Sequence, residues 1–171
     1  MKAQKALENF LDGMETINKF FKKYWILIFV FAIVFYNISI SDMQVKNLNV
    51  NKIQYVKIAG KILKTELALT SEAQQKGLSN RKELKEDESM LFVFNYPGRY
   101  SFWMKDMNFP IDIIWLDENL NIVYIKKNAM PESYPESFTP NQNSKYVLEV
   151  FASFSEKNNL KEGDKVKFLS S

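Results

Sequence analysis

An uncharged apolar stretch near the amino end constrains this chain most strongly. Residues 24–40 read YWILIFVFAIVFYNISI, and Asn37 and Ser39 are the only polar interruptions in these seventeen residues. A helix of this length rises roughly 26 Å at about 1.5 Å per residue, which nearly matches a hydrocarbon core of about 30 Å. The stretch therefore predicts a transmembrane helix followed by one folded domain.

Two other interpretations of this stretch are available. The core helix of a soluble protein seldom carries bulky apolar residues on every face, which argues against a buried helix. A cleaved signal peptide stays open, because the apolar centre at 25–36 is as short as a signal h-region. Against cleavage, 23 residues precede the stretch and no A-x-A-like site follows it.

The lysines on either side of the stretch predict its orientation. Asp42 and Lys46 are the nearest charges after it, whereas five lysines precede it: Lys2, Lys5, Lys19, Lys22 and Lys23. An excess of Lys and Arg marks the cytoplasmic side of a membrane. We therefore expect a single-pass membrane protein with a cytoplasmic amino terminus and an extracytoplasmic domain.

The chain divides into four predicted parts. Residues 1–23 form a cytoplasmic amphipathic segment, 24–40 the transmembrane helix, 41–52 a linker and 53–171 the extracytoplasmic domain. In the first part, apolar residues recur at helical spacing, at Leu7, Phe10, Leu11, Met14, Ile17 and Phe21. This amphipathic helix either lies on the inner membrane surface, pairs with a helix of a partner membrane protein, or simply leads into the anchor.

Composition excludes several classes of function. The chain has no histidine and no cysteine, which excludes the usual zinc sites, Ser-His-Asp and Cys-His catalysis, and disulfides. Beyond residue 40 there are 18 basic and 17 acidic side chains, because the first 40 residues hold five and three of the totals of 23 and 20. A near-neutral domain gives no electrostatic case for nucleic acid, and no glycine-rich nucleotide loop is present. We expect no metal, no cofactor and no nucleic acid.

Short apolar segments separated by turns fill the predicted domain. Strands are predicted at 53–58, 62–69, 90–94, 101–104, 111–116, 121–126, 146–150 and 165–169. A short helix is predicted at 71–76, with Thr70 as its N-cap and Gly77 as its end, and a second at 151–159. Residues 95–98 predict a turn, and 128–143 a long loop. The fold class is mostly β, a sandwich or barrel-like fold with one or two short helices, preceded by the transmembrane helix.

Several blocks of the sequence resemble a known family. They read GLSNRKEL at 77–84, MLFVF at 90–94, WMKDMNFPID at 103–112, VLE at 147–149 and GD at 163–164. In this order and spacing, over about residues 53–169, they resemble the prokaryotic domain of unknown function 192 family, whose blocks are G-L-M-x-R-x-x-L, G-M-L-F-x-F, W-M-K-N-T-x-x-P-L-D, V-L-E and a late G-D. The resemblance implies a compact, mostly β fold and brings no established reaction.

The chain departs from the family pattern at several positions. Ser79 stands where Met is usual, Ser89 and Ser153 each replace a Gly, and Asp106-Met107 replaces Asn-Thr. The last change removes a hydroxyl from the most polar block. Any reaction that needs this hydroxyl is in doubt for this chain.

Trp103 and Lys105 are the first candidates for ligand binding. Two residues apart in a strand, they share one face. The ring then offers a flat platform, and the ammonium group a polar clamp, for a small ligand such as a sugar. In the alternative interpretation Trp103 packs in the core and Lys105 extends outward.

Three charged residues complete the candidate set. Asp112 and Glu149 lie within apolar strand segments, where a buried carboxylate must be paired or hydrogen-bonded. Arg81 is a suitable bidentate partner for a carboxylate. These residues either meet Lys105 in one polar cleft or form a buried ion-pair network that stabilises the fold.

These candidates support three functions. The first is a membrane-anchored, non-enzymatic binding or accessory domain for a small-molecule or envelope ligand. The second is a hydrolase of cell-envelope material that uses Asp112 and Glu149, whose carboxyl groups would lie about 5–10 Å apart in an open cleft. The third is a structural partner of another membrane protein. The sequence identifies no catalytic residue beyond that pair.

Overall fold

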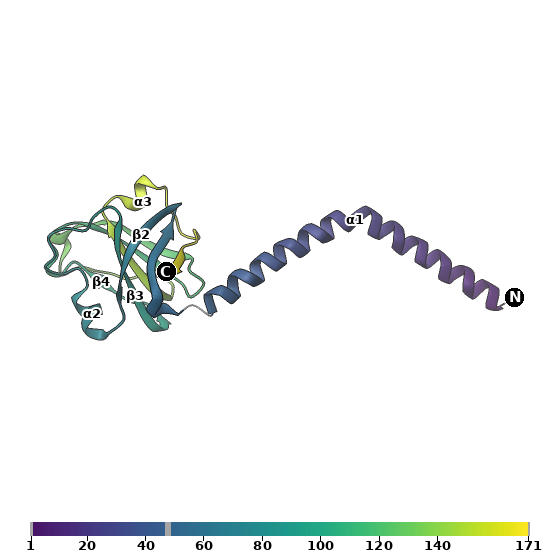
Figure 1. Ribbon diagram of the computed structural model, residues 1–171, viewed down its shortest axis with the longest axis horizontal. Coiled ribbons are helices and arrows are strands. Elements are labelled where there is room, and N and C mark those ends of the chain that lie inside the picture. Colours follow the sequence, from purple (N-terminus) through teal and green to yellow (C-terminus); the bar gives the residue numbers. More distant parts are fainter. Residues whose placement is uncertain (1, 47–48, 171) are drawn as a thin grey trace. The chain divides into compact units, whose positions relative to one another are not determined.

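The computed structural model describes residues 2–46 and 49–170 and divides into two compact units, Met1–Leu48 and Asn49–Ser171. The first unit contains one helix, α1 (Lys2–Lys46) (Figure 1). This helix covers the predicted amphipathic segment and the apolar stretch, and it continues into the predicted linker at 41–52. The short 3-10 helix η1 (Val50–Lys52) occupies the end of that linker, whereas 47–48 lie outside the described residues.

The apolar stretch of α1 does not meet the requirements of a membrane crossing. Within the part of the chain that the structure describes, no helix combines sufficient length with sufficient apolar character to span a bilayer. The predicted transmembrane helix at 24–40 is therefore not supported. Its apolar centre at 25–36 has twelve residues and rises about 18 Å as a helix, which is short of a hydrocarbon core of about 30 Å.

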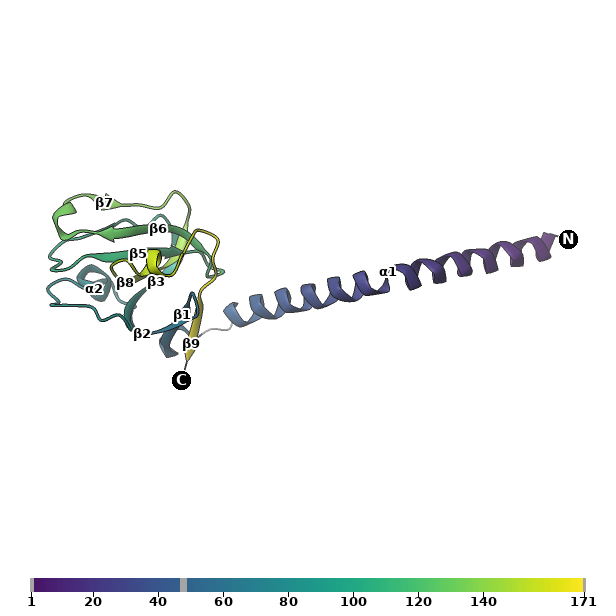
Figure 2. The ribbon, with the colours of Figure 1, turned by 90° about the horizontal axis from the view of Figure 1, so that it is seen from above.

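The second unit is built on one seven-stranded sheet, with the order β6-β5-β8-β3-β2-β1-β9 (Figure 2). Its strands are β1 (Ile53–Ile58), β2 (Lys61–Ala68), β3 (Glu88–Gly98), β5 (Ile111–Leu116), β6 (Ile122–Ala129), β8 (Ser144–Phe151) and β9 (Lys167–Ser170). A small second sheet pairs β4 (Phe102–Trp103) with β7 (Ser137–Phe138). The mostly-β class is confirmed. One open sheet with a two-stranded companion replaces the predicted sandwich or barrel.

One strand pair in the large sheet is parallel. β2 and β3 run in the same direction, and parallel neighbours need a crossover of a dozen or more residues. Residues 69–87 make this crossover and contain α2 (Ser71–Lys76). The Thr70 side chain accepts a hydrogen bond from the Ala73 amide at 3.2 Å, so the predicted N-cap is confirmed.

The remaining short elements differ from the sequence prediction. The helix expected at 151–159 is the single turn α3 (Phe154–Lys157). The loop expected at 128–143 contains the 3-10 helix η2 (Pro131–Ser133) and the strand β7.

The central strands of the large sheet are buried on both faces. Successive side chains of a strand point to opposite sides, so neighbouring residues belong to different faces. On one face, Phe92, Ile113 and Val147 join a core cluster with Leu78 and Met104 from the segments that cover it. The alternate residues of the same strands, which are Leu91, Ile114 and Leu148, are fully buried on the other face. The candidate site lies on the first of these faces.

Candidate functional site

A pocket of about 600 Å³ lies between α2 with its following loop, the strands β3 and β8, and the β4 segment. Figure 1 shows α2 and β4 at the same end of the domain. Gln74 anchors α2 there, because its amide donates hydrogen bonds to the carbonyls of Ala68 on β2 at 3.2 Å and Val93 on β3 at 2.9 Å. The crossover of the fold therefore builds one wall of the pocket.

Aromatic rings make up another wall. Phe94 stacks on Tyr100 with ring centres 3.5 Å apart, and Phe92 meets Phe102 edge to face at 4.8 Å. The indole of Trp115 donates a hydrogen bond to the Tyr100 carbonyl at 2.8 Å, which fixes the loop that carries this ring. Because these rings contact one another, their exposed surfaces form a preorganised apolar wall.

The loop after α2 is attached to the loop after β4. The Ser79 hydroxyl donates to the Lys105 carbonyl at 2.9 Å, and the Asn80 amide donates to the Asp106 carbonyl at 2.8 Å. These two bonds hold the segment with Trp103 beside the end of α2. Two blocks that lie far apart in the sequence thus line one pocket.

Gly77 lets the backbone approach the base of the pocket. Its φ of +47° and ψ of −131° belong to a region that only glycine adopts without strain. An added Cβ would lie 3.3 Å from the Phe92 ring and 4.0 Å from Oε2 of Glu149. A side chain here would therefore compete for the space above Glu149.

Glu149 is a buried carboxyl group at the base of the pocket, and one of its two oxygens has no hydrogen-bond partner within the described part of the chain. Its residue is 5% exposed, and its Oε2 has no hydrogen-bond partner among the residues that the structure describes. Burial raises the pKa of Glu149 to about 8, although the charge of Arg81 acts in the opposite direction. At neutral pH Glu149 is therefore mainly a carboxylic acid, which can donate one hydrogen bond and accept others.

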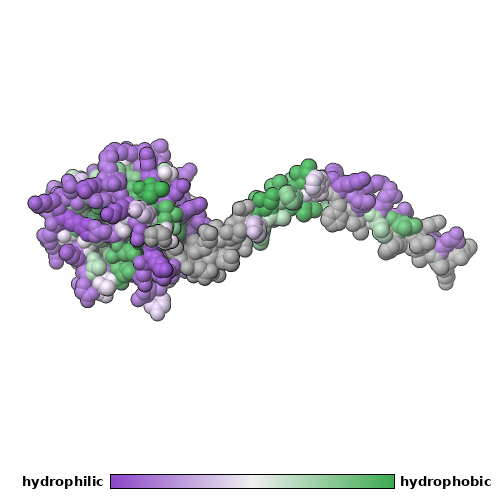
Figure 3. All heavy atoms as spheres, in the orientation of Figure 1, coloured by the Kyte–Doolittle hydropathy of each residue, from purple (hydrophilic) through white to green (hydrophobic). Residues whose placement is uncertain are grey.

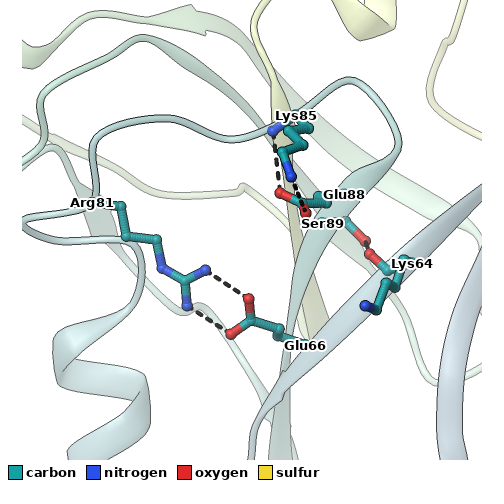
Figure 4. A network of polar contacts seen from close by, with 6 residues as sticks. All are labelled: Lys64, Glu66, Arg81, Lys85, Glu88 and Ser89. Atoms are coloured by element: carbon teal, nitrogen blue, oxygen red, sulfur yellow. Dashed lines mark hydrogen bonds and ion pairs between the residues drawn. The ribbon is translucent and has the colours of Figure 1, made fainter.

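Arg81 pairs with a different carboxylate from the two that the sequence suggested. Its guanidinium donates to both carboxylate oxygens of Glu66, at 2.6 and 2.7 Å (Figure 4). The hydrogen bonds from Arg81 lower the pKa of Glu66. This pair is partly exposed, and such pairs contribute about 0–1 kcal/mol to stability. The predicted pairing of Arg81 with Asp112 or Glu149 is wrong.

Asp112 is fully buried and has a structural role. Its Oδ1 accepts hydrogen bonds from the backbone amides of Asn128 at 2.8 Å and Ser153 at 3.2 Å, and its Oδ2 accepts one from Ser155 at 2.7 Å. The carboxylate thus connects β5 to the end of β6 and to the turn that begins α3. Backbone donors, and not an arginine, satisfy this buried charge.

The register of β5 and β8 separates the two candidate carboxylates. Asp112 lies opposite Val150, whereas Glu149 lies opposite Ile113. Directly opposed residues share a face, so Asp112 and Glu149 point to opposite faces of the sheet. They cannot act as a glycosidase pair, and no cluster of three acidic side chains within the described residues could hold a metal ion.

Trp103 and Lys105 both line the pocket, and Trp103 is 54% exposed. The indole meets the Tyr134 ring edge to face at 6.1 Å, while Met104 between the two candidates is buried. The interpretation that packs Trp103 in the core is wrong. Three predicted residues therefore line the pocket, namely Trp103, Lys105 and Glu149, whereas Asp112 lies on the other face and Arg81 is engaged by Glu66.

Sequence reasoning missed most of the aromatic wall and the contribution of α2. Phe92 and Phe94 alternate within the MLFVF strand, and this spacing places both rings on one face. This alternation is sufficient to predict that the two rings lie side by side on one face of the strand. Lys76 gave no comparable signal, because only the crossover of the chain brings the last turn of α2 to the pocket.

Comparison with known proteins identifies the domain. The model of the DUF192 family, described as "Uncharacterized ACR", matches residues 54–168. The chain belongs to the DUF192 family. The resemblance seen in the sequence blocks is thereby confirmed, and the family description assigns no ligand or reaction.

Solved structures share the DUF192 fold of this chain. A protein of unknown function from Novosphingobium aromaticivorans is 34% identical, with a TM-score of 0.61, over 66% of this chain and 81% of its own. A protein from Sinorhizobium meliloti, named as a proposed transcription regulator, is 26% identical, with a TM-score of 0.61, over 68% of this chain and 91% of its own. A search of curated proteins gives no match.

The DUF192 sequence blocks meet at the pocket. Gly77 from the first block, Trp103 and Lys105 from the W-M-K block, and Glu149 from the V-L-E block all line it. Met107, at the position where the family pattern has Thr, lines it too. The hydroxyl that this chain lacks is therefore missing from the pocket itself.

Proposed function

We propose that the DUF192 domain of this chain is a non-enzymatic binding module for a small ring-bearing ligand of the sugar class. The observation that carries the proposal is a half-exposed Trp103 at the edge of a pocket whose base is a buried, unpartnered Glu149. Glu149 lacks the second carboxylate that a hydrolase of this type needs, because Asp112 faces away.

The chemistry of the pocket fits a sugar. A pocket of about 600 Å³ falls within the range of about 300–1,000 Å³ that is usual for small-molecule sites. Aromatic rings pack against the apolar face of a pyranose, while a few polar groups fix its orientation. Ser71, Gln75 and Ser79 provide such groups on the same pocket.

Tryptophan fluorescence of the full-length protein tests this function. Titration with a panel of cell-wall sugars and peptides is expected to change the emission of wild-type protein. Trp103→Ala is expected to weaken binding, measured by calorimetry, about tenfold, because the stacking surface is lost. Trp25→Phe alters a tryptophan outside the domain and should leave the affinity unchanged. If no member of the panel changes the emission or gives heat of binding, the proposal fails.

The apolar centre of α1 supports a membrane location for the domain. Its large apolar side chains are 46–72% exposed on all faces of the helix, from Trp25 to Phe31 and from Ile33 to Tyr36. Figure 3 shows a green, apolar stretch on part of α1. Contiguous apolar surface of this kind marks contact with a membrane or a protein. With the lysines that precede it, this surface supports attachment of α1 to a bilayer.

Membrane fractionation tests this location. The full-length protein is expected in the membrane pellet after cell lysis. The double variant Ile28→Lys/Val30→Lys is expected in the aqueous fraction, because each lysine at the centre of an apolar segment costs about 2.5–3.5 kcal/mol. Ile62→Lys, at an exposed position on β2, is the matched control and should stay in the pellet. Recovery of the intact wild-type chain in the aqueous fraction would refute membrane attachment.

A further inference from the structure

The pocket also contains charged and polar side chains that can select a ligand by its charge. The inference drawn from them rests on the proposed sugar-binding function. We propose that the ligand is an acidic sugar, a pyranose that carries a carboxylate or phosphate. Its negative charge is attracted by Lys76 and Lys105, and one of its oxygens accepts a hydrogen bond from the carboxyl group of Glu149.

Two lysines give the pocket a positive edge. Lys76, in the last turn of α2, and Lys105, after β4, both line it. Across residues 2–46 and 49–170, neither lysine takes part in an ion pair. The charge of Arg81 adds little, because Glu66 balances it at 2.6 Å. An anionic ligand would therefore find two cationic side chains without competing carboxylates.

Glu149 does not cancel this positive charge at neutral pH. The carboxyl group lies in the core face of β8, and its neighbours on the adjacent strands, Met90 and Ile113, are apolar. Burial holds its pKa at about 8, so the group is neutral and offers an O–H donor. A carboxylic acid kept neutral in an apolar site can stabilise an anion by hydrogen bonding.

The remaining charges near Glu149 agree with this assignment. Arg81 is the nearby cation that acts on Glu149, and Glu66 and Glu88 are the acidic groups that act on Arg81. A cationic sugar would meet Lys76 and Lys105 at the edge of the pocket. A neutral sugar could accept hydrogen bonds from both lysines, but it would lack the charge attraction that an acidic sugar gains.

Calorimetry with four sugars tests the inference on the full-length protein. At about pH 7, glucuronate or glucose 6-phosphate is expected to bind about tenfold tighter than glucose, and glucosamine more weakly than glucose. Lys76→Gln and Lys105→Gln should each reduce this preference several-fold. Lys61→Gln, which removes an exposed lysine outside the pocket, is the matched control and should preserve it.

The pH dependence of binding tests the role of Glu149. For wild-type protein, affinity for the acidic sugar should fall from about pH 7 to about pH 9, as the carboxyl group loses its proton. Glu149→Gln retains a donor that cannot ionise, so its affinity should stay level over this range.

The outcomes separate the inference from the function on which it rests. Equal affinity for glucose and the acidic sugars, or a preference for glucosamine, overturns the inference and leaves the binding function standing. Absence of binding by all four sugars and by the wider panel overturns both. A flat wild-type pH profile overturns the assignment of Glu149 as the donor.

Discussion

Replacing Asp112 with alanine is expected to lower the free energy of unfolding of the DUF192 domain by about 4 kcal/mol. Three backbone amides lose their acceptor at once, the buried one of Ser155 and the partly buried ones of Asn128 and Ser153. Each unsatisfied buried donor costs about 1–3 kcal/mol, less what the loops recover by relaxing toward water. Urea denaturation followed by circular dichroism measures the change.

Two further variants serve as controls for the Asp112→Ala measurement. Asp112→Asn keeps one acceptor oxygen and should lose about half as much stability. Asp87→Ala, which removes an exposed carboxylate, should change the free energy by less than about 0.5 kcal/mol. A loss below about 1 kcal/mol for Asp112→Ala would contradict the structural role assigned to this carboxylate.

Glu149 is expected to make the folded domain less stable as the pH rises from about 4.5 to about 8. Its pKa is about 8 in the folded state, against an ordinary value of 4.5 for the exposed group. Between these values the unfolded chain has lost the proton and the folded domain still holds it. The free energy of unfolding then falls by up to about 1.4 kcal/mol per pH unit, on the order of 5 kcal/mol in all. Below this window both states are protonated, and above it both are ionised.

Comparison of wild type with Glu149→Gln over about pH 4 to pH 9 isolates this effect. The amide cannot ionise, so the difference in stability between the two proteins should follow the titration of Glu149. Glu66 contributes with the opposite sign, because its lowered pKa gives stability that is lost only below its ordinary value of 4.5. A difference that stays constant across the window would show that Glu149 is not a neutral acid in the folded domain.

Local signals predicted much of the fold. The strands at 53–58 and 111–116 were predicted with the bounds that the structure has, and so was α2. The turn predicted at 95–98 is wrong, because β3 continues to Gly98 and pairs it with Ser144 of β8 after a register shift. Pairing with a distant strand overrides the local preference of Asn, Pro and Gly for a turn.

Strand register explains what the sequence could not predict about the site. Asp112 and Glu149 have similar apolar neighbours in the sequence, yet a shift of one residue in the β5–β8 pairing would place both carboxylates on the same face. Likewise, nothing in the sequence distinguished Glu66 as the partner of Arg81. Trp103 and Lys105 both line the pocket as the sequence suggested, but β4 ends at Trp103 and Lys105 lies in the turn that follows, so strand alternation is not the reason.

A departure from the family pattern became interpretable only in the structure. Ser153, where the pattern has Gly, adopts a φ of +65°. For a residue with a side chain, this left-handed conformation costs about 1–2 kcal/mol. The hydrogen bond from the Ser153 amide to Asp112 compensates in part. The glycine of the pattern is thus explained by backbone geometry at this turn, without reference to a ligand.

The parallel pairing of β2 and β3 limits how the family can diversify. Because residues 69–87 both connect these strands and wall the pocket, a deletion that left fewer than about a dozen residues would make the strands unable to run side by side in one direction. Point substitutions that leave the backbone unchanged do not shorten the crossover and are not restricted in this way. Ser79 and Met107, two departures from the family pattern, both lie on the pocket wall. Relatives should therefore differ in what they recognise through point substitutions and not through loop length.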